Sequence, residues 1–365
     1  MIKVLHIIGN LRLGGAQVCV KYLVEQGDRE KVRCWVYPLR SRPVEMPIAG
    51  QVIDVPYRNY DPRKFGAILR LCREHKIDII HAHLHKPILG SLLAKRYCDV
   101  RVVIHEHGPI FRPGLQYDLY RRLLRRWRSA ADGVIAVSAA AAERLVAVAG
   151  IERERIRVIR NAVDLEAFKT DATARQAVRR AWGVTDDQVV LGYVGRLDFV
   201  KGVDLLVEAF GLLQKESERY YLVLAGDGPQ RGKLEERVKQ LTAADHVRFL
   251  GFCPRPQEVM QGFDIGVVPS RQEALGIAAL ELMRMQVPLV GSGVEGMAEI
   301  LQDEQTGLIP NQNSPEGIAR CVKRLTADKA LRQRLSRAAY QFTECFGIAE
   351  YVRAVEEVYR EVLKI

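Results

Sequence analysis

The segment Ile265-Gly-Val-Val-Pro-Ser-Arg-Gln-Glu-Ala-Leu-Gly-Ile-Ala-Ala-Leu-Glu281 carries the clearest structural signal in the sequence. It begins with four apolar residues, the length of a buried strand, and it ends in the first residues of a short, mostly apolar helix. A strand that leads into a helix is the repeating unit of parallel α/β sheets, which bind ligands beyond the carboxyl ends of their strands. The sequence therefore predicts an α/β protein with its chemistry in post-strand loops.

The same alternation of strand-length and helix-length segments occurs along the rest of the chain. Strands are expected in two groups, at 4–8, 77–81, 102–105 and 134–137, and then at 189–194, 221–225, 247–250 and 265–268. Between the groups the chain becomes polar and helical, so a boundary is expected between residues 160 and 185. Two domains are also expected because 365 residues exceed the roughly 250–300 that share one hydrophobic core.

We expect two Rossmann-like domains that face each other across a cleft lined by post-strand loops. The first covers residues 1–165 and the second covers residues 166–346, while a C-terminal helix over about 347–365 returns to the first domain. This helix is expected because apolar residues recur there at spacings of three and four: Ile348, Tyr351, Val355, Val358, Tyr359 and Val362.

The composition is that of a soluble globular protein, with 48% hydrophobic and 27% charged residues. The formal net charge of +11 favours anionic partners, which include nucleic acid, acidic lipid headgroups and phosphorylated substrates, and charge alone does not choose among them. The apolar run at the N-terminus is too short for a signal peptide, and no later run reaches about 18 residues. A cytoplasmic location is therefore expected.

Two glutamates bracket the start of the helix in the opening segment. Free N–H groups at Leu275, Gly276 and Ile277 would form an anion site there, and Glu281, two turns into the helix, would hydrogen-bond a diol such as a ribose. The alternative is that Glu273 caps the helix and Glu281 lies on a solvated face. The apolar neighbours of Glu281 oppose that alternative, because an unpaired carboxylate among them would be costly.

A second loop, Gly192-Tyr-Val-Gly-Arg-Leu-Asp-Phe-Val-Lys-Gly202, follows the first expected strand of the second domain. Arg196 and Lys201 would converge on one anion, and this pairing suits a diphosphate whose charge grows as it leaves. The alternative is a pair of solvated surface cations. Near the chain start, Gly14-Gly15 lets the backbone approach a ligand at the next helix, although a plain turn is as good an interpretation.

Histidines gather at the ends of two expected strands. His81, His83 and His85 would share one strand face if the strand continued that far, which raises the alternative of a three-histidine metal site. We expect no metal, because histidines at these ends can instead donate to substrate hydroxyls or phosphate. His107, before Gly108-Pro109, is the best placed to do so.

The segment 117–128 has the pattern of a basic amphipathic helix. Its cations include Arg121, Arg122, Arg125 and Arg126, with leucines and aromatic residues between them. Such a helix can rest on anionic lipid headgroups, which would place the protein at the inner face of the cell membrane. The alternative is a solvated helix whose apolar residues pack inward.

Taken together, these motifs resemble the retaining GT-B glycosyltransferases of family 4 over nearly the whole chain. They occur in the family's order: Gly14-Gly15, Asp78-Ile-Ile-His-Ala-His83, Ile135-Ala-Val-Ser138, Val158-Ile-Arg-Asn-Ala-Val-Asp164, Gly195-Arg196, Lys201-Gly202, Ala225-Gly-Asp-Gly-Pro229 and Glu273-x7-Glu281. The sequence departs from the family at Ala162 and Leu275, where Gly and Phe are common, and at Arg284-Met-Gln-Val-Pro288. These departures leave the donor's identity open.

The resemblance implies that the second domain binds a nucleotide-sugar, with a UDP- or GDP-sugar as the expected donor. Gly195, Arg196 and Lys201 would hold its diphosphate. Glu281 would hold the ribose and Glu273 the sugar, while Phe252 would adjoin the base. In the first domain, which the resemblance makes the acceptor domain, Gly14, Gly15 and His107 would approach the donor, with His107 near the transferred sugar.

The resemblance also implies transfer with retained anomeric configuration and without a metal or other cofactor. The family's usual path needs no protein nucleophile, because the departing phosphate helps to take the acceptor proton. The sequence has no Asp-x-Asp motif, as expected for metal-independent transfer. The acceptor would be a saccharide, a lipid-linked saccharide or a natural product, and not nucleic acid. Two alternatives remain, a sugar-nucleotide epimerase on the same fold and a non-catalytic membrane-associated binding protein.

Overall fold

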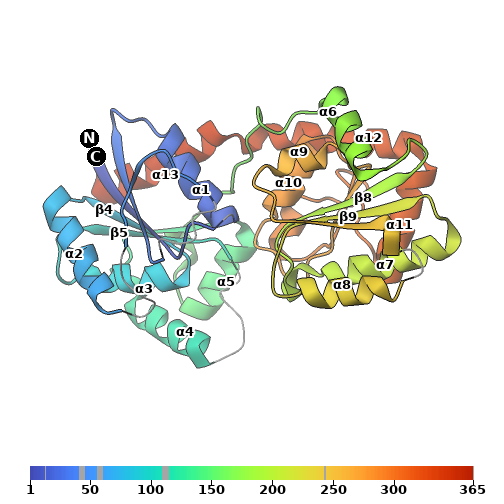
Figure 1. The fold of residues 1–365 in the computed structure, drawn as a ribbon. Coiled ribbons are helices and arrows are strands. Elements are labelled where there is room, and N and C mark those ends of the chain that lie inside the picture. Colours follow the sequence, from blue (N-terminus) through green and yellow to red (C-terminus); the bar gives the residue numbers. More distant parts are fainter. Residues whose placement is uncertain (13, 41–45, 56–60, 109–114, 242–243, 365) are drawn as a thin grey trace. The chain divides into compact units, whose positions relative to one another are not determined.

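The computed structural model describes residues 1–365 except 13, 41–45, 56–60, 109–114, 242–243 and 365. The chain folds into two compact units (Figure 1), one formed by Met1–Ala162 with Ile348–Ile365 and the other by Val163–Gly347. Each unit is built on a parallel sheet with helices between its strands. The predicted α/β class is confirmed.

The first unit has a sheet of seven strands in the order β3-β2-β1-β4-β5-β6-β7. Its strands are nearly continuous apolar runs because both faces of a parallel sheet are covered. Its elements are β1 (Ile2–Ile8), α1 (Gly15–Gln26), β2 (Val32–Pro38), β3 (Gln51–Val52), α2 (Arg63–His75), β4 (Ile79–His83), α3 (His85–Ala94), β5 (Arg101–Glu106), α4 (Leu115–Trp127), β6 (Gly133–Ala136), α5 (Ala139–Ala149), β7 (Ile156–Val158) and α13 (Ile348–Leu363).

Helix α13 packs on the first unit, as predicted for the C-terminal helix. In Figure 1 it lies beside the strands formed by the first part of the chain, and it contacts α1, β5 and β6. Tyr351, Val355 and Tyr359 are buried in this contact. The hydroxyl of Tyr359 lies 2.6 Å from Nδ1 of His81, so the helix is joined to β4 by a buried hydrogen bond as well as by apolar packing.

The second unit has a sheet of five strands in the order β10-β9-β8-β11-β12. The strand order reverses between β8 and β11, and ligands of open α/β sheets bind at such a reversal. Its elements are α6 (Ala172–Trp182), β8 (Val189–Val194), α7 (Val203–Glu216), β9 (Tyr220–Ala225), α8 (Arg231–Lys239), β10 (Val247–Gly251), α9 (Pro256–Met260), β11 (Ile265–Val268), α10 (Ile277–Arg284), β12 (Leu289–Gly291), α11 (Pro315–Ala327) and α12 (Lys329–Phe342).

The structure corrects one expectation about the histidines. Strand β4 ends at His83, and Leu84 adopts a left-handed backbone conformation with φ of 67°. That turn starts helix α3 at His85. His85 therefore does not continue the strand face of His81 and His83, and the proposed set of three alternating histidines is wrong.

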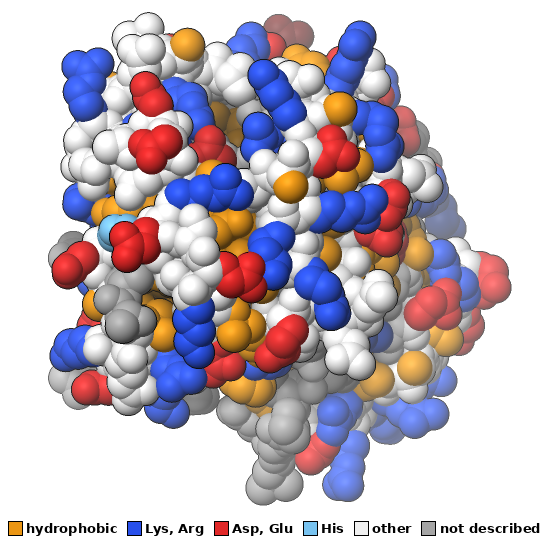
Figure 2. All heavy atoms as spheres, turned by 90° about the vertical axis from the view of Figure 1, so that its right-hand side faces the viewer, with side chains coloured by type: hydrophobic (Ala, Val, Ile, Leu, Met, Phe, Trp, Pro, Cys, Tyr) orange, Lys and Arg blue, Asp and Glu red, His pale blue; other side chains and the backbone are white. Residues whose placement is uncertain are grey.

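Charged side chains of both signs are interspersed on the face of the molecule shown in Figure 2. The positive net charge is therefore not gathered into one large patch on that face. Among the described residues, no helix is both long enough and apolar enough to cross a membrane.

Replacing Tyr359 by Phe should lower the stability of the first unit by about 1–3 kcal/mol, because Nδ1 of the buried His81 loses its hydrogen-bond partner. The midpoint of thermal unfolding measures the effect. Tyr97→Phe is the matched control, since Tyr97 is 57% exposed. Equal midpoints for the two variants would show that the Tyr359 hydroxyl does not stabilise the fold.

Candidate functional site

Two loops of the second unit lie together because the strands before them are neighbours. The first loop, residues 195–202, follows β8, and the second loop, residues 269–276, follows β11. The backbone N–H of Arg271 donates to the carbonyl of Val200 at 2.8 Å. Gly202 has φ of 64°, and a Cβ there would lie 2.0 Å from the carbonyl oxygen of Pro269. Only glycine lets the loops approach this closely.

An ion pair joins the two loops through residues 72 positions apart in the chain. Nζ of Lys201 lies 2.6 Å from Oε2 of Glu273, and the hydroxyl of Ser270 donates to the same oxygen at 3.1 Å. The side chain of Glu273 is only 12% exposed. Glu273 does not cap helix α10, whose N-cap is Gly276 without a side-chain hydrogen bond. The capping alternative for Glu273 is therefore wrong.

The N-terminus of α10 has unused hydrogen-bond donors. Within the part of the chain that the structure describes, the N–H groups of Leu275, Gly276 and Ile277 donate to no other group. Gly276 has φ of 99°, and a Cβ there would lie 2.9 Å from Cε of Met297. The turn therefore requires glycine, and it leaves three donors that are free to bind an anion.

Glu281 lies within helix α10, between apolar residues of the sequence, and is half-buried. It has no hydrogen-bond partner among the described residues, and burial raises its pKa to about 8. Because burial disfavours the charged carboxylate, Glu281 is mostly protonated near neutral pH. The alternative of a solvated helix face is therefore wrong. A carboxyl without a partner can bind a hydroxyl-bearing ligand.

Arg196 and Lys201 lie on one loop but pair with different carboxylates. Nη2 of Arg196 lies 2.8 Å from Oδ2 of Asp198, and the arginine side chain is 57% exposed. Gly195 precedes it with φ of 148°. Phe252, after β10, is 42% exposed and lies two strands away from β8 in the sheet order. The structure does not bring Phe252 into contact with the ion pair.

The first unit holds the remaining predicted residues. Gly14 is the N-cap of α1 and Gly15 is its first residue, in the turn after β1. His107 comes directly after β5, and its Nε2 lies 3.0 Å from Nδ1 of His83. Burial lowers the pKa of His107 to about 3, against a smaller opposing effect of the Asn161 amide.

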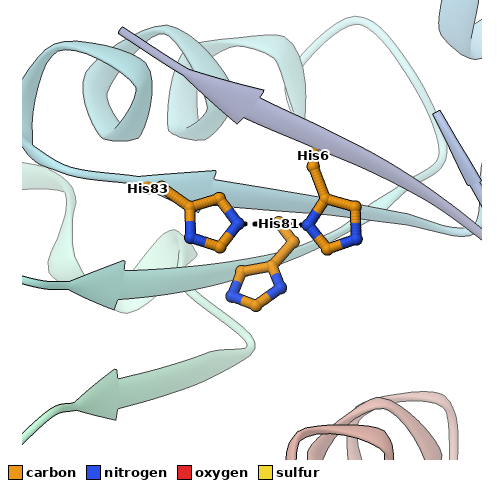
Figure 3. A group of neighbouring side chains, drawn as sticks. All are labelled: His6, His81 and His83. Carbon is orange, nitrogen blue, oxygen red and sulfur yellow. Dashed lines mark hydrogen bonds between the residues drawn. The ribbon is translucent and has the colours of Figure 1, made fainter. Parts of the chain in front are cut away.

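Five histidines of the first unit form a cluster of neighbouring rings, which we call the histidine cluster: His6, His81, His83 and His105, which are buried, and His107, which is half-buried. Figure 3 shows three of them, from β1 and β4. Two sets of three, one of His6, His81 and His83 and one of His83, His105 and His107, place one nitrogen from each ring within 4.8 Å of the others. These sets are the described histidines that could hold a metal ion.

The predicted basic helix is α4, and its four arginines differ in their surroundings. Arg121 pairs with Asp118 and is half-buried, whereas Arg122, Arg125 and Arg126 are exposed. Leu124 is buried and Leu119 is 56% exposed. The helix therefore combines inward packing with an outward basic surface, so both interpretations of the sequence describe part of it.

Sequence reasoning missed side chains that hold the site in place. Asn313 lies just before α11, and its amide donates to the carbonyl oxygens of Pro269 and Ser270 at 3.1 and 3.2 Å. Arg271 pairs with Asp204 at 2.6 Å. No local pattern marks Asn313, because its partners lie more than forty positions away.

The chain matches two family models and a curated relative. The family model for glycosyl transferases group 1 matches residues 174–342, and that for glycosyltransferase family 4 matches residues 13–167. The alpha-D-kanosaminyltransferase of Streptomyces kanamyceticus is 30% identical over 78% of this chain and 77% of its own length.

Two solved structures share the fold. Anabaena HepE, solved with UDP and glucose, has a TM-score of 0.86 at 20% identity and covers 98% of this chain and 99% of its own. WaaG, a glycosyltransferase involved in lipopolysaccharide biosynthesis, has a TM-score of 0.78 at 18% identity and covers 97% of this chain and 98% of its own. The predicted GT-B fold is confirmed.

Replacing Glu281 by Gln should stabilise the protein increasingly as the pH rises. The folded-state pKa of about 8 lies above the ordinary value of 4.5. Between these values the unfolded chain releases a proton that the folded chain keeps, so wild-type stability falls over this range, and the glutamine variant lacks that loss. Denaturant unfolding at pH 5 and pH 8 measures the effect, which should reach a few kcal/mol at pH 8. A difference that does not change with pH would contradict the raised pKa.

Proposed function

Because the chain belongs to the group 1, family 4 glycosyltransferases, we propose that it moves a hexose-type sugar from a nucleotide-sugar to an acceptor with retained anomeric configuration and without a metal ion. The observation that carries the proposal is the joined pair of loops after β8 and β11. There, Lys201, Glu273, the free N–H groups before α10 and the unpartnered carboxyl of Glu281 come from one sheet edge.

The donor would bind along this edge of the second unit. The free N–H groups of Leu275, Gly276 and Ile277, with Arg196 and Lys201 and the Gly195 backbone, supply donors for a diphosphate. Glu281 would bind the ribose, Glu273 the sugar, and Phe252 would adjoin the base. A UDP- or GDP-sugar is the expected donor, and HepE, which has the same fold, was solved with UDP. In the first unit, Gly14, Gly15 and His107 would serve the same reaction.

The charges at this edge support the proposal of transfer with retention and without a metal ion. Lys201 and Arg196 can stabilise the negative charge that grows on the departing diphosphate. A metal ion can have the same role at other phosphate-transferring sites. The carboxylate of Glu273 is held by Lys201 and Ser270, so it is poorly available as a nucleophile. We therefore favour the path in which the leaving phosphate takes the acceptor proton.

The acceptor would be a saccharide, a lipid-linked saccharide or a natural product, with a role in cell-surface polysaccharide or lipopolysaccharide synthesis. The similarity to WaaG, a glycosyltransferase involved in lipopolysaccharide biosynthesis, supports the lipopolysaccharide class of acceptor. An epimerase would consume no acceptor, and a non-catalytic scaffold would have no need of the complete set of donor residues. Transfer in the cytoplasm, at the inner membrane face, is the function we propose.

A thermal-shift screen without metal tests the donor site. UDP, GDP, ADP, TDP and their hexose forms are added to the wild type, to Glu281→Ala and to the control Glu236→Ala, which removes an exposed glutamate from α8. A nucleotide bound at 100 times its Kd should stabilise the folded protein by about 2.7 kcal/mol. One nucleotide should raise the melting temperature of the wild type and the control but not that of Glu281→Ala.

The matching sugar donor then decides the reaction. Proton NMR of the product should show the anomeric configuration of the donor, at a rate that EDTA leaves unchanged. Inversion, or loss of activity in EDTA, would refute the corresponding part of the proposal. If no nucleotide shifts the melting temperature, the scaffold alternative gains weight.

Binding of α4 to anionic membranes is tested by charge removal. Replacing Arg122, Arg125 and Arg126 by Gln should weaken binding to phosphatidylserine vesicles by about 3 kcal/mol, or roughly a hundredfold, at about 1 kcal/mol per cation. The control replaces Lys233, Lys239 and Arg337, which are exposed cations of the second unit, and removes the same charge. Equal weakening in both variants would show that net charge, and not the position of the arginines on α4, drives binding. Complete loss of binding in both variants would lead to the same conclusion.

A further inference from the structure

Tyr193 of β8 has its hydroxyl against the backbone of residues 195–202, which we call the donor loop. The side chain is 1% exposed and packs in the apolar core of the second unit. Its hydroxyl donates to the backbone carbonyl of Arg196 at 3.0 Å. A carbonyl can only accept, so the direction of this hydrogen bond is fixed. Burial also raises the pKa of Tyr193, so the phenol keeps the proton that it donates.

The same hydroxyl lies against the glycine that precedes Arg196. A Cβ at Gly195 would lie 2.8 Å from the hydroxyl oxygen of Tyr193. The φ of Gly195 is 148°, a conformation that disfavours any side chain at this position. One buried oxygen atom therefore contacts the backbone both before and after the Cα of Arg196.

The turn after β9, residues 225–228, holds the donor loop through backbone contacts. The N–H of Gly195 donates to the first carbonyl of this turn at 3.0 Å. A Cβ at Gly226 would lie 1.8 Å from the carbonyl oxygen of Gly195, and a Cβ at Gly228 would lie 2.3 Å from the carbonyl oxygen of Leu197. The residues on both sides of Arg196 are therefore held against a turn that requires its glycines.

The side chain of Arg196 is less firmly held than its backbone. It is 57% exposed, and its Nη2 lies 2.8 Å from Oδ2 of Asp198. Exposed ion pairs of this kind contribute little free energy. The direction of the guanidinium therefore depends mainly on where the backbone starts it. An arginine has five N–H donors, so donors remain for an anion beside the pair with Asp198.

A buried tyrosine hydroxyl needs a partner in any fold, and Tyr221 of β9 shows the same chemistry away from the donor loop. Its hydroxyl donates to the carbonyl of Trp182, the last residue of α6, at 3.3 Å. Tyr221 is 5% exposed and belongs to the same sheet as Tyr193. The two tyrosines therefore differ in what their hydroxyls hold, which makes Tyr221 a matched control.

We propose that Tyr193 is a positioning residue, which sets the backbone of Arg196 and so directs its guanidinium to the diphosphate of the donor. The inference rests on the proposed function for the identity of this anion, and it assigns no contact between Tyr193 and the substrate. An arginine whose backbone is already held loses less conformational freedom when it binds. It also meets the charge that grows on the leaving diphosphate without rearrangement of the loop.

Inorganic pyrophosphate is the probe, because it carries a diphosphate without a base or a sugar. Phosphorus NMR titrations at low salt give its Kd for the wild type, Tyr193→Phe, Arg196→Ala, the double variant and Tyr221→Phe. Tyr193→Phe should weaken binding about fivefold, whereas Tyr221→Phe should stay within about twofold of the wild type. In the Arg196→Ala background, Tyr193→Phe should change the Kd by less than about twofold, because the phenol acts through Arg196.

Thermal unfolding and kinetics separate this role from a general loss of stability. Each tyrosine variant keeps its ring and loses one buried hydroxyl, so the two unfolding midpoints should fall by similar amounts. With the donor found in the nucleotide screen, Tyr193→Phe should lower kcat/KM for the donor about tenfold, while the KM for the acceptor should stay within about twofold.

Four results would overturn the inference. The first is unchanged pyrophosphate binding in Tyr193→Phe, or an equal loss in Tyr221→Phe. The second is a Tyr193→Phe effect of the same size with and without Arg196, because general loosening of the unit gives additive losses. The third is a wild type that does not bind pyrophosphate, or binding that Arg196→Ala leaves unchanged. The fourth is a Tyr193→Phe variant that does not fold, because the hydroxyl would then serve the fold and not the site.

The same measurements distinguish a failure of the proposed function from a failure of the inference. Pyrophosphate binding does not require the protein to transfer a sugar. If the variants bind pyrophosphate as expected but no nucleotide-sugar is consumed, the positioning role of Tyr193 stands and the proposed function is wrong.

Discussion

Hydrogen bonding between β8 and β11 is the contact on which the candidate donor site depends. It places two post-strand loops side by side, although the residues that they contribute lie about seventy positions apart. The backbone bond from Arg271 to Val200 and the close approach at Gly202 then fix the distance between the loops. At that spacing, Lys201 forms an ion pair with Glu273, and the carboxylate of Glu273 does not cap the N-terminus of α10. The free N–H groups before α10 follow from the same arrangement.

Buried glutamates and buried histidines make the stability of the fold depend on pH in opposite directions. Burial raises the pKa of Glu106 and of Glu281 to about 8, so each costs stability as the pH rises from about 4.5 to 8. The histidine cluster has lowered pKa values, so it costs stability as the pH falls below about 6.5. The fold therefore carries desolvated acids and bases that an ordinary core would exclude. Such groups concentrate where proteins bind and transform ligands.

Local patterns were enough to predict the strand-to-helix units, because apolar runs and helical spacing are properties of neighbouring residues. They predicted that the C-terminal helix returns, and they singled out Glu281 from its apolar surroundings. They did not predict β2, where Arg33 interrupts the apolar run, or β12, which has only three residues. They also extended the histidine face to His85, since nothing in the sequence marks the left-handed turn at Leu84.

The sequence by itself determined the α/β class, the alternation of elements and the residues available for chemistry. These depend on side-chain period and on motifs a few residues long. Only the tertiary structure decided which groups face one another. It paired Arg196 with Asp198 and Lys201 with Glu273, neutralised Arg121 with Asp118, and gathered histidines of β1, β4 and β5 into one cluster. The physical reason is that ion pairs, burial and hydrogen-bond direction depend on distances through space, which strand order and helix packing set between residues far apart in the chain.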